Sequence, residues 1–140
     1  MILQMNYEEL TALRAGARSL LDGAEPAPGG VLAPPERRAQ VESLVAKLDG
    51  DISLETLGEV RDLEVALDAV VSWLRVEMES AIVATHAAHE QAVASYFDFA
   101  HVFTVHHRVR EMAAEMSALI ELMTGEAPTP ESTRSIHFPD

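Results

Sequence analysis

Histidines and glutamates are the residues of this chain with the types and spacing best suited to chemistry. Five of the six histidines lie within 22 residues, and His86 and His107 are each followed four residues later by a glutamate, Glu90 and Glu111. Residues four apart share one face of a helix, so each His/Glu pair can bind a metal ion. A chain that folds back around residues 98–99 would bring the two pairs together. The pattern predicts a site for iron, manganese or zinc inside a helical bundle.

The His-xxx-Glu spacing resembles one element of hemerythrin-like bundles, but the other ligand spacings of that family are absent. The Glu-xx-His pair of ferritin-like di-iron proteins is also missing, and Asp98-xx-His101 is its nearest match. We therefore assign the chain to no family.

The same histidines have a simpler interpretation. On one continuous helix, four of these residues fall opposite the apolar stripe and would be solvated: His86, Glu90, His101 and Glu111. His106 falls on the apolar side, where a histidine most often belongs to the core. Surface pairs and a core histidine are therefore the alternative to a metal site.

Aromatic residues form the second cluster. Four of the seven in the chain lie within eight positions, and three of these, Tyr96, Phe99 and Phe103, share one helix face while Phe97 points elsewhere. Bulky side chains on more than one face indicate burial by more than one neighbour, either in a bundle core or at an interface. With the single tryptophan added, the predicted interface residues are Trp73, Tyr96, Phe97, Phe99 and Phe103.

A long segment must position both clusters. Residues 59–124 contain neither glycine nor proline, and apolar side chains recur at three- and four-residue steps from Leu63 to Met123. One unbroken helix of this length would measure about 100 Å, which is long for a small domain. We therefore predict a break between Ala92 and Ala100, near Ser95, and helices over about 53–94 and 95–124. If the helix is instead continuous, its stripe must bury against another chain.

The N-terminal part predicts two short helices. Asn6 and Glu9 have the spacing of a capping box, which predicts a helix over about 6–22, followed by a Pro/Gly-rich loop over 23–34. Pro35 suits a first helical turn, so a second helix is expected over 35–49. The fold class is all-α: two short helices on a long helix or antiparallel hairpin, in one domain over 1–124. Residues 125–140 are expected to form an irregular tail.

Charge and composition exclude several functions. There are 23 acidic residues against 10 basic ones, and the net charge of −13 argues against binding to nucleic acid or to anionic membranes. The chain has no cysteine, phosphate-binding loop or nucleophile elbow, so an enzyme is disfavoured. Neither a signal peptide nor a membrane-spanning segment is visible, which suggests a cytoplasmic protein or a component of a virion or other assembly.

The leading functional hypothesis is a non-enzymatic helical interaction protein. It would be a small oligomer, or an accessory or scaffold subunit of a larger assembly, that associates through the apolar stripe of residues 63–123 without a cofactor. One alternative is a metal-binding four-helix protein that uses the two His/Glu pairs. The other is an acidic decoy or inhibitor that occupies the basic site of another protein.

Overall fold

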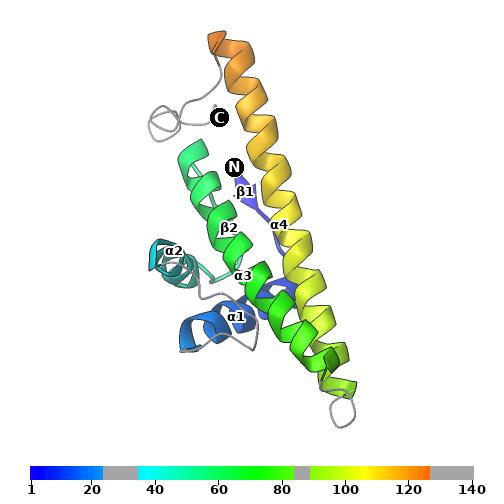
Figure 1. Cartoon of the computed structure of the whole chain (residues 1–140). Helices are drawn as coiled ribbons and strands as arrows, with labels where there is room; N and C mark the ends of the chain where they lie inside the picture. The colour runs from blue at the N-terminus through cyan, green and yellow to red at the C-terminus, as the bar shows by residue number, and fades with distance from the viewer. Residues whose placement is uncertain (24–34, 84–88, 127–140) are drawn as a thin grey trace.

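The chain folds into an antiparallel helical hairpin with two short helices packed beside it, as Figure 1 shows. The computed structural model describes residues 1–23, 35–83 and 89–126, apart from the side chains of residues 35–37 and 89. Within these ranges the elements in chain order are β1 (Ile2–Leu3), α1 (Tyr7–Asp22), α2 (Pro35–Ala46), β2 (Ile52–Ser53), α3 (Leu57–Val83) and α4 (His89–Thr124). The predicted all-α class is confirmed, and the hairpin replaces the single long helix.

Helix α1 begins as the capping-box spacing predicts. The Asn6 side chain accepts a hydrogen bond from the Glu9 backbone N–H at 2.7 Å, and the Glu9 carboxylate accepts one from the Asn6 N–H at 3.0 Å. These two bonds satisfy N–H groups that a helix leaves unpaired at its first turn. Glu9 is also buried against α4, where Arg108 donates to its Oε2 at 2.9 Å and to the Gln4 carbonyl at 2.7 Å. This contact joins the first helix to the last.

The predicted position of the break in the long segment is wrong. Helix α3 ends at Val83 and α4 begins at His89, so Ser95 and the rest of residues 92–100 lie inside α4. The start of the long segment also differs from the prediction, because Ser53 lies in β2. Thr56 caps α3 instead, accepting from the Glu59 N–H at 3.1 Å. Capping spacing alone does not start a helix when the preceding turn is itself helical.

The second helix is shorter than predicted, because α2 ends at Ala46 and the backbone turns at Lys47. Two arginines connect α1 with α2 and with the segment that follows α2. Arg38 of α2 donates to the Leu21 carbonyl at the end of α1 at 2.8 Å, and Arg14 of α1 donates to the Leu48 carbonyl at 2.9 Å. Both bonds satisfy carbonyls that would otherwise lack a donor. The predicted tail over 125–140 lies outside the described residues from 127 onward.

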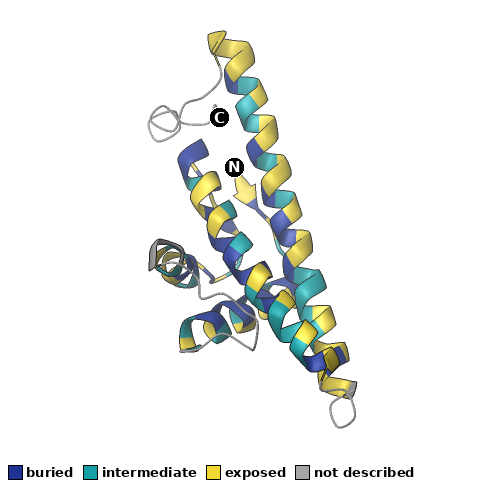
Figure 2. Cartoon of the chain, in the orientation of Figure 1, coloured by how far each residue is buried: buried dark blue, intermediate teal, exposed yellow. Residues whose placement is uncertain are grey.

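The core is aliphatic and lies mainly between α3 and α4. Side chains of both helices at three- and four-residue steps face each other there, and Figure 2 shows the buried positions on the facing sides. The buried residues of the two helices include Leu63, Leu67, Val70 and Leu74 of α3 and Val102, Val105, Val109 and Ala113 of α4, and Val70 and Leu74 lie beside Gly16 of α1 as well. Most of the apolar stripe over 63–123 is therefore buried within the chain itself.

Candidate interaction surface on helix α4

The four predicted metal ligands are not brought together among the described residues. His86 lies outside them. Glu90 and His107 lie on the same helix, 17 residues and therefore about 25 Å apart, too far to share one ion. His107 and Glu111 do pair, with 3.1 Å between Nε2 and Oε1, but both side chains are more than 60% exposed. The described part of the chain contains no group of three or more His, Cys, Asp or Glu side chains that could hold a metal ion.

His106 belongs to the core, as its place on the apolar side of the helix predicts. Its side chain is buried, and burial lowers its pKa because a charged imidazolium loses its hydration there. Arg110 and His107 lower the pKa further, while Asp68 and Glu64, on the facing helix α3, act in the opposite direction. The surroundings of His106 therefore favour its neutral form.

The five predicted interface residues fall into two groups. Trp73 and Phe99 are engaged within the chain. The Trp73 indole N–H is within hydrogen-bond distance of Ser19 Oγ in α1, at 2.9 Å, and of Glu77 Oε1, at 2.8 Å. Phe99 packs against the core, with the Arg75 guanidinium 5.7 Å from its ring centre. These two residues hold helices together and are not free surface.

Tyr96, Phe97 and Phe103 form the second group and are exposed. Their exposed fractions are 54%, 54% and 47%, and Val93 on the same side of α4 is 42% exposed. Tyr96 and Phe97 contact each other edge to face, with ring centres 5.7 Å apart, and the Phe103 ring lies 5.8 Å from that of Phe99. The aromatic cluster therefore contributes one ring to the core and three to the surface.

The exposed rings belong to a second stripe on α4, which we call the outer stripe. Its members recur with the seven-residue repeat of helix–helix contacts, and they are Val93, Tyr96, Phe97, Ala100, Phe103 and Thr104. At about 100° per residue these positions centre on the side of α4 opposite the core positions Val102, Val109 and Ala113. One helix thus carries two apolar faces, and the described part of the chain covers one of them.

The apolar periodicity of the sequence predicts one stripe where the structure has two faces. It assigns Tyr96 and Phe103 to the same stripe as Phe99, because both faces contribute residues at three- and four-residue steps. The signal that separates them is the pair of interleaved repeats, with 93, 96, 100 and 103 in one and 92, 99, 102 and 109 in the other.

Comparison of the chain with protein-family models, with curated proteins and with solved structures gave no match. No helix among the described residues combines the length and the apolar character that crossing a membrane requires.

Proposed function

We propose that this protein is a helical interaction protein that associates through the outer stripe of α4, with a second copy of the chain as its partner. The observation that carries the proposal is the exposure of three aromatic rings on a helix whose opposite face is already buried. Clustered exposed aromatic side chains are typical of interfaces rather than of ordinary solvated helix faces. Covering the exposed half of each ring would bury about 100 Å² and contribute about 2–3 kcal/mol per ring.

The arrangement of residues around Ala100 supports a second copy as the partner. Phe97 and Phe103 lie three positions on either side of this small residue. Two α4 helices that cross antiparallel at Ala100 would place Phe97 close to Phe103 of the second copy. A two-fold axis creates each contact twice, as in the isologous interfaces of most dimers. The product would be a four-helix bundle made of two hairpins.

The test is the molecular mass of the protein in solution. Light scattering at about 100 µM should give about 30 kDa, twice the 15.2 kDa of one chain. Phe97→Asp and Phe103→Asp should reduce it to the monomer mass with unchanged circular dichroism, since both side chains are about half exposed. Leu122→Asp is the matched control, because Leu122 is 82% exposed on α4 but lies outside the outer stripe. A monomeric wild-type protein would contradict self-association.

A further inference from the structure

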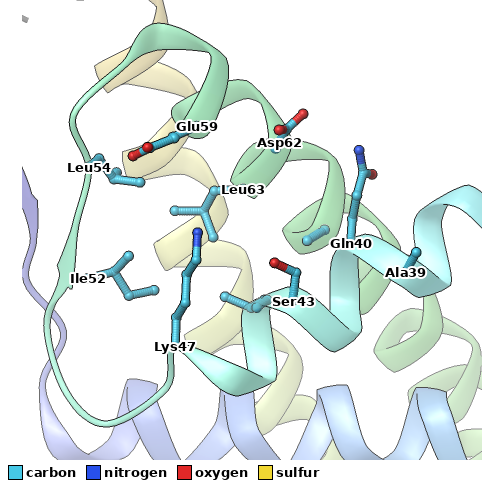
Figure 3. Close-up of a pocket in the computed structure, with 11 residues that line it drawn as sticks. Ala39, Gln40, Ser43, Lys47, Ile52, Leu54, Glu59, Asp62 and Leu63 are labelled. Carbon is cyan, nitrogen blue, oxygen red and sulfur yellow. The ribbon is translucent and has the colours of Figure 1, made fainter. Parts of the chain in front are cut away.

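A groove between α2, β2 and α3 has the lining of a small-molecule site (Figure 3). Its volume is about 220 Å³. The floor consists of five apolar side chains, all less than 10% exposed: Leu44, Ile52, Leu54, Leu63 and Ala66. The groove lies away from the outer stripe, so it is independent of the proposed interface.

The rim of the groove carries groups of both charges. Lys47, the single lysine of the chain, extends from the end of α2 toward α3 in Figure 3, and Ser43 lies beside it on α2. Asp62 and Glu59 line the α3 side, where the Glu59 carboxylate accepts from the Glu55 backbone N–H at 2.9 Å. Within the described residues, Lys47 Nζ lies within 4.0 Å of no carboxylate, so the groove keeps an ammonium group and a carboxylate available.

Gln40 supplies the observation that indicates a ligand. Its side-chain oxygen is buried at the groove and has no hydrogen-bond donor among the described residues. Buried polar atoms in folded proteins nearly always have a partner, so an acceptor that has none among the described residues can accept from a bound molecule.

We infer that the groove binds a small zwitterionic α-amino acid with an aliphatic side chain. The aliphatic chain would contact the apolar floor, the carboxylate would pair with Lys47 and accept from the Ser43 hydroxyl, and the ammonium group would donate to Gln40 Oε1 and Asp62. Pockets for drug-sized ligands occupy about 300–1,000 Å³, so this smaller volume suits a ligand the size of leucine.

The test is calorimetric titration with L-leucine, compared with two molecules that each lack one charge, 4-methylpentanoate and 3-methylbutylamine. Leucine should bind about tenfold or more tightly than either, because each comparator leaves one charged partner in the groove unsatisfied. Lys47→Met should reduce leucine affinity by about the same factor, whereas Arg18→Met, an exposed arginine on α1, should leave it unchanged. Failure of leucine to bind at about 10 mM, or equal binding by wild type and Lys47→Met, would overturn the inference.

Gln40→Met separates a binding role from a structural one. If the oxygen serves the ligand, this variant should bind leucine about tenfold more weakly while the ligand-free protein melts at the same or a higher temperature. Unchanged leucine affinity in Gln40→Met would mean that the oxygen takes up water only, and would contradict the site as proposed.

Discussion

At the scale of single residues, Gly23 packs directly against the ring of Trp73. A Cβ atom on Gly23 would lie 2.4 Å and 2.6 Å from two carbons of the Trp73 ring, closer than real Cβ atoms come to anything. The ring cannot turn away freely, since its N–H is within hydrogen-bond distance of Ser19 and Glu77. The absence of a side chain at Gly23 therefore allows the end of α1 to pack against α3.

Gly23→Ala should destabilise the protein by about 1–3 kcal/mol, because overpacking displaces the indole from its partners. Chemical denaturation followed by circular dichroism measures the loss, and the fluorescence of this single tryptophan should shift as its contacts change. The control is the same substitution in a Trp73→Phe background. Phenylalanine lacks the two clashing ring carbons, so the penalty should largely disappear there. An equal penalty in both backgrounds would locate the strain elsewhere.

His106 should make stability depend on pH. Its folded-state pKa lies below the ordinary value because it is buried, whereas in the unfolded chain it takes up a proton near pH ~6.5. The unfolded state therefore binds more protons over the interval between the two pKa values, and the free energy of unfolding falls as pH falls through it. The loss cannot exceed about 1.4 kcal/mol per pH unit from one group.

Urea denaturation at pH 7.5 and at pH 5.5 measures this dependence. His106→Gln, which keeps a polar side chain but cannot take up the proton, should flatten the difference between the two pH values. A His107→Gln control at the neighbouring exposed position should keep it. Identical stabilities of the wild type at both values would exclude a depressed pKa for His106.

At the scale of elements, the two faces of α4 should respond differently to mutation. Phe99→Ala removes a ring that packs against the core and should cost the monomer about 1–3 kcal/mol, since the ring is only partly buried. Phe103→Ala should change monomer stability by less than about 1 kcal/mol and weaken association instead. Denaturation of dilute protein and light scattering of concentrated protein separate the two effects. Equal loss of monomer stability in both variants would show that the outer stripe is part of the core.

Local signals explain why some elements could be predicted from the sequence. The start of α1 depends on Asn6 and Glu9, three residues apart, so the two bonds that cap the helix are encoded within one turn. The end of α3 depends on distant residues. Residues far apart in the sequence, such as Arg75 and Phe99, meet where the two long helices pack, and no glycine or proline marks where α3 ends. The apolar periodicity continues from one helix into the next, so it could not reveal the interruption.

The same distinction applies to the candidate site. The aromatic residues of the outer stripe could be identified from composition and spacing, but which rings face outward depends on where α3 lies. The metal hypothesis depended on one assumed fold-back point near residues 98–99. Once α4 continues through that point, Glu90 and His107 are separated by nearly five helical turns.

At the scale of the whole molecule, net charge should govern how association responds to salt. Two copies of a chain with a net charge of −13 repel each other, so apolar association should strengthen as salt screens that repulsion. We expect the dimer dissociation constant to fall between 50 and 500 mM NaCl, as measured by sedimentation equilibrium. An acidic decoy bound to a basic protein would show the opposite dependence, so weakening of any complex with salt would favour that alternative.

The link between Glu9 and Arg108 has a consequence for the order in which the chain folds. The two residues are 99 positions apart, whereas α3 and α4 are separated by only five residues. Closing a short loop costs less entropy than closing a long one, so the hairpin should form first and α1 should dock last. During synthesis α1 emerges before α4, so it meets its partner arginine only after the intervening residues have been made. Until then its apolar face and its acidic side chain have no permanent neighbours, and this interval is when the nascent chain is most exposed to aggregation and proteolysis.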